Sequence, residues 1–212
     1  MLEAIVASCR AIASEPNLLI LYHLSQEPEL SAGVIAQRAA MLPSVASTHL
    51  GCLASRDLIR CRRSGARAYY RIASSAEGAQ WPTPAPLMCR AFGDPDWATR
   101  GWDEGDTVHV QRLADAVAEG ILVVCDVIFD AATAFANVRR LQIIRYVAKH
   151  GPCTNETLRN QLRMSSRACW RHIDKLARRG YVAAAAGGWQ LVRRGRTPLH
   201  RELLASVMRG LP

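Results

Sequence analysis

The sequence predicts a mainly α-helical protein with small β-hairpins, in which one supersecondary unit occurs twice in tandem. Three observations support this fold class. Apolar residues recur at helical spacing along most of the chain, and two short stretches alternate around glycine as β-hairpins do. The pattern of the first half also returns 123 residues later. A chain of 212 residues, half of them apolar, is long enough for two small domains.

The first copy lies within residues 1–75. Residues 2–13 carry apolar side chains at helical spacing, and Pro16 stands near the start of a second helix, where its missing N–H costs nothing. Ser31 is positioned to cap a third helix, and Pro43 to begin a fourth. These signals predict four helices before the first hairpin.

A predicted hairpin closes each copy. Residues 58–73 alternate around a Ser-Gly pair, and residues 181–193 around a Gly-Gly pair. Chance similarity between two amphipathic segments is the alternative to a repeat, but hairpins at the same place in both copies argue against it. Other positions also match at a spacing of 123 residues: Leu18 and Leu141, Ser31 and Thr154, His49 and His172, Leu53 and Leu176, Ile59 and Val182.

Residues 76–106 separate the copies and are rich in proline, glycine and acidic residues. This composition predicts a connector, because it interrupts any long periodicity. Its apolar patch at residues 87–92 is suited to docking on a neighbouring element. Three tryptophans also argue against a free tether: Trp81, Trp97 and Trp102.

The net charge of +9 is unevenly distributed. Residues 1–75 carry +3, the connector −4 and residues 107–212 +10. A strongly basic half indicates a polyanionic partner, with a solvated surface as the alternative.

The order helix, helix, turn, helix, hairpin is that of a winged helix-turn-helix. Three motifs of the first copy are Ser47-Thr48-His49-Leu50-x-x-Leu53, Asp57-Leu58-Ile59 and Arg63-Ser64-Gly65-Ala66-Arg67-x-Tyr69-Tyr70-x-Ile72. On these motifs, the segment 10–73 resembles the ArsR-like winged-helix transcriptional regulators, and residues 137–189 resemble them more loosely. The resemblance implies that the last helix before each hairpin reads the DNA major groove and that the hairpin, or wing, lies beside the phosphates. We call residues 44–57 and 165–180 the first and second reading helices.

The copies depart from the family pattern in different ways. The first has Leu42 where a capping Ser or Thr is usual and Asp57 where a helix-ending Gly is usual. The second keeps Ser165 and Gly180, but its wing, residues 183–188, carries no charge. The two copies therefore need not have the same function.

The second reading helix carries cations at spacings of four, four and three residues, which place them on one helix face. We expect Arg167 and Arg171 to reach base edges, guanine above all, and the others to contact phosphates. An ordinary solvated face is the alternative. Trp170 is suited either to stacking at the DNA or to packing between domains, and packing is favoured. The DNA-binding candidates of this helix are Ser166, Arg167, Arg171, Lys175 and Arg178.

The first reading helix offers neutral candidates, so other groups must hold the DNA backbone while they read bases. The first wing supplies those groups. A His satisfied within the helical core is the alternative for His49. The candidates are Ser44, Ser47, Thr48 and His49 on the helix, and Arg62, Arg63 and Arg67 on the wing.

Signals for catalysis, metals and membranes are weak. No phosphate-binding glycine loop, carboxylate pair or nucleophile motif occurs in a convincing context, so we predict no enzyme and no cofactor. Asp126 and Asp130 are interpreted as a polar stripe on a helix over residues 120–135. The seven cysteines form no C-x-x-C, and His200 and Glu202 do not share a helix face, so we predict no metal site. The start of the chain does not resemble a signal peptide and no apolar run can span a bilayer, which favours a cytoplasmic protein without membrane contact.

These observations predict a sequence-specific, double-stranded DNA-binding transcriptional regulator with two winged-helix units. Two alternatives stay open: a tandem winged-helix scaffold that binds protein, as in chromosome segregation, and a replication-initiator-like DNA binder. Residues 107–135 predict one long or two consecutive helices, and Thr197-Pro198 begins a last helix. Such flanking helices are suited to a homodimer or to an intramolecular pseudo-dimer, and the sequence does not choose between them.

Overall fold

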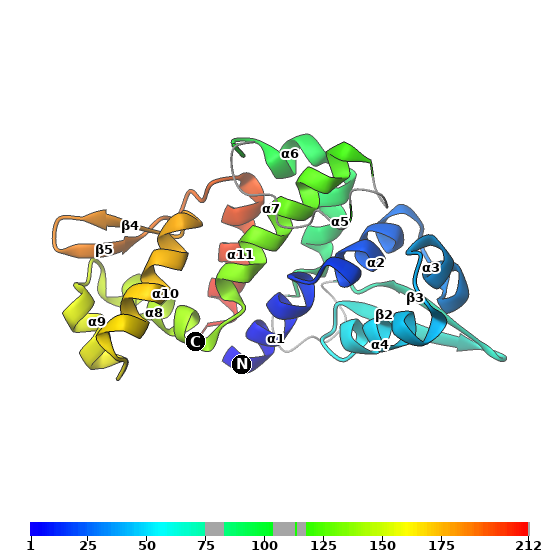
Figure 1. Cartoon of the computed structure of the whole chain (residues 1–212), viewed down its shortest axis with the longest axis horizontal. Coiled ribbons are helices and arrows are strands. Elements are labelled where there is room, and N and C mark those ends of the chain that lie inside the picture. The colour runs from blue at the N-terminus through cyan, green and yellow to red at the C-terminus, as the bar shows by residue number, and fades with distance from the viewer. Residues whose placement is uncertain (75–82, 104–112, 114–117, 212) are drawn as a thin grey trace.

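The mainly helical prediction is confirmed by a computed structural model of the chain, which describes residues 1–74, 83–103, 113 and 118–211 (Figure 1). The described residues form helices and two small antiparallel sheets. Trp81 and most of the predicted helical segment before residue 118 lie outside the described residues.

The N-terminal half begins as the sequence predicts. The Ser31 hydroxyl caps α3 by accepting a hydrogen bond from the Val34 N–H, and Pro43 lies in the first turn of α4. A short strand before α3 joins the predicted hairpin in a three-stranded sheet of order β1-β3-β2. The elements are α1 (Leu2–Ile12), α2 (Glu15–Gln26), β1 (Leu30–Ser31), α3 (Ala32–Arg38), α4 (Pro43–Ala54), β2 (Ile59–Ser64) and β3 (Arg67–Ile72).

The C-terminal half contains the second predicted hairpin, formed by β4 and β5. Side chains of Asn137, Thr154 and Ser165 cap the first turns of α8, α9 and α10. The elements are α7 (Glu119–Phe135), α8 (Val138–His150), α9 (Asn155–Gln161), α10 (Ser166–Arg178), β4 (Val182–Ala185), β5 (Gly188–Leu191) and α11 (Pro198–Arg209).

Element boundaries in the two halves recur at a fixed spacing. Helix α9 begins and ends 123 residues after α3, and α10 and β4 begin 123 residues after α4 and β2. Positive φ angles recur as well: Ala40 (49°) and Arg163 (48°) precede the two reading helices, and Asp57 (56°) and Gly180 (68°) follow them. Aspartate is one of the few residues that enter this left-handed region. Asp57 therefore keeps the backbone conformation for which the family pattern has glycine.

In each half, the chain bends by a similar angle before its three-helix unit, which is α2–α4 in the N-terminal half and α8–α10 in the C-terminal half. The bend between α1 and α2 is 82°, and the bend between α7 and α8 is 78°. In the first corner the Asn17 amide donates a hydrogen bond to the Ala11 carbonyl (2.8 Å). In the second, Arg140, which stands 123 residues after Asn17, donates from Nε to the Ala134 carbonyl (2.6 Å). Both side chains satisfy a carbonyl at the end of the preceding helix, where no intrahelical donor is available.

Long helices fill the middle of the molecule, and the two three-helix units lie at its opposite ends (Figure 1). Helix α1 packs along α7, and α11 packs on the other side of α7. The predicted connector contains two further helices, α5 (Ala85–Gly93) and α6 (Pro95–Thr99), which pack on these elements. Phe92 of the predicted docking patch is buried and meets the Tyr22 ring edge to face, with centroids 5.6 Å apart.

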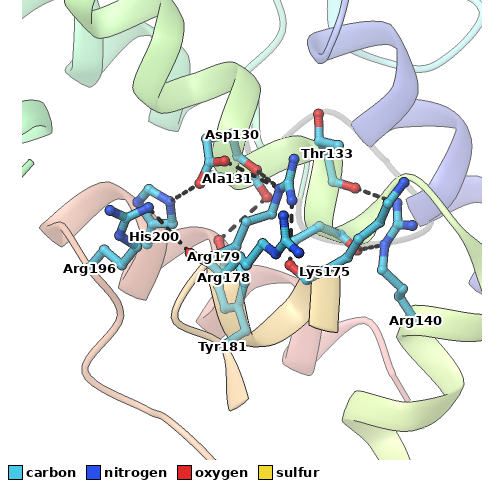
Figure 2. A network of polar contacts seen from close by, with 11 residues as sticks. Asp130, Ala131, Thr133, Arg140, Lys175, Arg178, Arg179, Tyr181, Arg196 and His200 are labelled. Carbon is cyan, nitrogen blue, oxygen red and sulfur yellow. Dashed lines mark hydrogen bonds and ion pairs between the residues drawn. The ribbon is translucent and has the colours of Figure 1, made fainter. Parts of the chain in front are cut away.

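The interpretation of Asp126 and Asp130 as a polar stripe is wrong in one respect, because both carboxylates are buried. Figure 2 shows Asp130 between His200 of α11 and Arg179 at the end of α10. Its oxygens lie 3.2 Å from His200 Nε2 and 3.3 Å from Arg179 Nε. Buried charges persist when they are paired in this way. The network therefore ties the second reading helix to the central helices.

Candidate nucleic-acid interface

Helix α10 separates core and surface side chains as the sequence predicts. Cys169, Ile173 and Leu176 are buried against the rest of the C-terminal half. The Ser165 cap fixes the first turn, and the positive φ of Arg163 aims the helix away from α9. The predicted contact residues then lie exposed on the opposite side: Ser166, Arg167, Arg171, Lys175 and Arg178.

The cations of α10 are not equally available. Arg178 forms an ion pair with Asp174 on the next helical turn, with Nε and Oδ2 3.0 Å apart. Within the described part of the chain, no carboxylate lies within ion-pair distance of the Arg167, Arg171 or Lys175 side chains. Three unpaired cations on one exposed face give this helix a positive field, which attracts phosphate.

The expected packing of Trp170 between domains is wrong, because 58% of its surface is exposed. The side chain lies between Arg167 and Arg171 in sequence and faces solvent with them. Trp170 and Arg167 line a depression together with Asn155 and Arg159 of α9. A large exposed aromatic ring among cations is typical of an interaction site.

His172 of α10 points inward and belongs to the packing of the helix. It is buried, and its Nδ1 has no hydrogen-bond partner among the described residues. Burial is the main cause that lowers the pKa of His172, and nearby cations add to the effect: Arg140, Arg171, Lys175 and Arg139. The ring is therefore neutral at pH 7.

This burial gives a pH-dependent contribution to stability. Below about pH 6.5 the unfolded chain binds a proton at His172 that the folded chain resists, so the free energy of unfolding decreases as the pH falls. Above that pH both states are neutral at this ring and the contribution vanishes. We expect His172→Gln to lose less stability than the wild type between pH 7 and pH 5 in urea unfolding. Equal losses in the two proteins would contradict this assignment.

The first reading helix, α4, presents a different surface. Ser44, Ser47 and Thr48 are exposed, although the Thr48 hydroxyl donates to the Ser44 carbonyl of its own helix. His49 is half-buried, and its Nδ1 lies 2.8 Å from Asn17 Oδ1. The structure therefore brings the three hydroxyl residues to the surface and orients His49 toward α2.

Two exposed apolar residues near the start of the first reading helix were not among the predicted DNA-binding residues. Leu42 and Val45 are 71% and 41% exposed, beside Ser44. The only signal in the sequence was Leu42 itself, at a capping position where its side chain can accept no hydrogen bond. A groove-facing helix tolerates such residues because they can contact thymine methyl groups.

The first wing carries exposed arginines, of which one is paired with a carboxylate and two have no such partner among the described residues. Arg62 forms two hydrogen bonds with the Glu29 carboxylate (3.1 and 2.6 Å) and covers the Tyr69 ring. The Arg62 guanidinium lowers the pKa of Glu29 through the same hydrogen bonds. Arg63 and Arg67 are exposed and have no ion-pair partner among the residues that the structure describes. They are the cations of this wing that are available to phosphate.

The second wing is short and neutral, and it is held against α9. Trp189 donates from Nε1 to Asn155 Oδ1 (2.9 Å). Gly188 adopts a φ of 125°, and a Cβ there would lie 2.3 Å from the Cys153 carbonyl oxygen. Only glycine fits this close approach. The second wing therefore has backbone groups but no cation to offer DNA.

The described residues contain no group of three or more His, Cys, Asp or Glu side chains that could hold a metal ion. In the same part of the chain, no single helix is both long and apolar enough to cross a bilayer.

Comparison with known proteins bears on the C-terminal half. Residues 137–183 match the family described as winged helix-turn-helix DNA-binding. The match runs from the cap of α8 to the start of β4 and includes the whole of α10. No curated protein and no solved structure matches the chain. This match supports a winged helix-turn-helix of the DNA-binding kind at residues 137–183, a segment that contains α10.

Proposed function

We propose that the chain is a sequence-specific, double-stranded DNA-binding transcriptional regulator with two winged-helix units. The observation that carries this proposal is the exposed face of α10. It combines an exposed tryptophan with three cations that have no ion-pair partner among the described residues, on the helix that reads the major groove in a winged helix-turn-helix. A helix that only packed against protein would not collect these groups.

The N-terminal half is the second proposed unit, within residues 1–75. Its support is the recurrence, at 123 residues, of helix boundaries, positive φ angles and the hydrogen bond at the helix corner. The packing of α1 along α7 is the contact that an intramolecular pseudo-dimer needs. In this arrangement, residues 107–212 form the other unit, and the connector helices pack on these units, α5 on elements of both and α6 on α7 and α11.

The two proposed units contact DNA in different ways. In the second unit, Arg167 and Arg171 form paired hydrogen bonds with guanine, Lys175 contacts phosphate, and Trp170 packs on a thymine methyl group. In the first unit, small neutral residues of α4 lie in the groove while the wing holds the backbone. The target is therefore a pair of unlike half-sites.

Selection from a random pool of DNA duplexes tests this function. We expect one enriched sequence with two unlike halves, of which the half read by α10 is rich in guanine. Enrichment of only one half would limit DNA reading to residues 137–183. A pool without any enrichment at moderate salt would contradict the proposal and favour the protein-binding scaffold.

The first wing supplies a prediction about salt. We expect Arg63→Ala with Arg67→Ala to lower affinity about equally for cognate and scrambled duplexes. Each lost phosphate contact flattens the slope of log K against log salt by about 0.9, so the pair changes it by up to roughly two units. Arg62→Ala is the matched control, because Glu29 already neutralises that cation. A slope that is unchanged in the double variant would remove the wing from the interface.

Trp170 supplies a second prediction. Because the side chain is mostly exposed, we expect Trp170→Ala to change the free energy of unfolding by less than about 0.5 kcal/mol. The same substitution lowers affinity for the selected duplex by roughly tenfold, since a base contact is lost. Thermal unfolding and fluorescence anisotropy measure the two effects. Large destabilisation with unchanged affinity would show that the ring serves packing after all.

A further inference from the structure

The two halves differ in which helix covers the first helix of the three-helix unit, α2 in the N-terminal half and α8 in the C-terminal half. In the N-terminal half, α5 packs along α2, and Phe92 covers Tyr22. In the C-terminal half, α11 packs on α7, α6 and α5 instead. The corresponding face of α8 is left open, and Arg145 stands there at the position that matches Tyr22.

This open face forms a cavity of about 620 Å³ between α8, the start of α1 and the end of α11. The two ends of the chain lie near each other (Figure 1), and Leu2 and Leu211 both line this cavity. Its apolar lining includes side chains from several segments of the chain, among them Leu2, Leu162, Met208 and Leu211. A volume of this size is typical of small-molecule sites.

Cations stand along one edge of the cavity. Arg145 and Lys149 are exposed on successive turns of α8. Between them in sequence, Tyr146 packs on His150, with ring centroids 4.3 Å apart. No acidic residue lines the cavity among the described residues. The lining therefore combines an aliphatic floor with a positive edge.

We propose that this cavity binds an aliphatic monocarboxylate such as a medium-chain fatty acid. The carboxylate lies at Arg145 and Lys149, because a guanidinium can donate two parallel hydrogen bonds to it. The chain lies on the leucines and Met208, whose flexible thioether adapts to varied apolar shapes. This site goes beyond the proposed DNA reading and depends on none of the residues assigned to it.

Calorimetric titration with decanoate, below the concentration at which it forms micelles, tests the site. We expect one saturable site per chain, at least tenfold weaker binding of decanol, which lacks the charge, and no binding of acetate, which lacks the chain. Saturation far above one ligand per chain, or decanol binding as tightly as decanoate, would overturn the proposal. The titration contains no DNA, so its failure leaves the proposed function standing.

Variants locate the bound ligand. Arg145→Gln with Lys149→Gln weakens decanoate binding at least tenfold, and Met208→Glu abolishes it by placing a negative charge on the floor. Ala205→Glu adds the same charge to an exposed position of α11 outside the lining and leaves binding unchanged. Thermal unfolding verifies that each variant folds. Unchanged binding in the Gln pair overturns the proposal. The proposal is also overturned if the wild-type protein is a dimer that does not bind decanoate and that dissociates on Met208→Glu substitution, because a second copy then covers this face.

Discussion

Removal of either arginine at the centre of the α10 face is expected to lower affinity for the selected duplex by about 1–3 kcal/mol, or roughly 5- to 150-fold. Arg167 and Arg171 are exposed and unpaired among the described residues, so each can give both donor groups to one guanine. Arg167→Ala or Arg171→Ala should also relax specificity at one base pair. Competition binding with duplexes altered at single positions measures both effects.

Arg178→Ala is the matched control on the same helix. Its cation is already paired with Asp174, so its removal should change affinity much less and leave specificity intact. If Arg167→Ala and Arg171→Ala instead lower affinity equally for cognate and scrambled duplexes, α10 attracts the phosphate backbone and does not read bases. Base reading would then depend on the candidates of the first reading helix: Ser44, Ser47, Thr48 and His49.

The second large effect is expected at Asp130, a buried residue that is not proposed to contact DNA. Asp130→Ala should lower the free energy of unfolding by about 3–5 kcal/mol, because it leaves the mostly buried Arg179 side chain without its carboxylate partner. His200, fully buried beside it, also loses the acceptor of its Nε2. Chemical unfolding followed by circular dichroism gives the change.

Asp174→Ala is the control for this loss. It also removes a carboxylate from an arginine, but from an exposed pair whose contribution is about 0–1 kcal/mol. Asp130→Asn should fall between the two, since an amide oxygen can still accept hydrogen bonds without the charge. Equal stability of the Asp130→Ala and Asp174→Ala proteins would mean that the buried network contributes nothing net.

The sequence predicts those parts of the fold that depend on local signals. Caps at Ser31, Thr154 and Ser165, a helix-starting proline at Pro43 and the hairpin at residues 181–193 all occur where their signals predict them. Each depends on a residue and its near neighbours in the chain. The inward face of α10 follows from helical spacing in the same way.

Features that depend on distant partners could not be predicted. Asp130 resembles a surface carboxylate until His200, seventy residues later, is seen against it. Arg62 and Arg178 resemble free cations in the sequence, whereas the fold pairs each with a carboxylate. A tryptophan such as Trp170 is expected to be buried from its sequence alone, and only the position of α10 at the edge of the molecule leaves it exposed. Burial and pairing are tertiary properties, and periodicity carries little information about them.

The packing of α1 against α7 lies within one polypeptide. A repressor assembled from separate subunits falls apart on dilution, and its stability varies with protomer concentration. Here the two halves share a fixed effective concentration set by their covalent link. In the proposed pseudo-dimer, DNA binding would not require two chains to associate, so occupancy of the target would not depend on a monomer–dimer equilibrium. In that proposed arrangement each half can also acquire substitutions that the other does not share, so each can adapt separately to its own half-site.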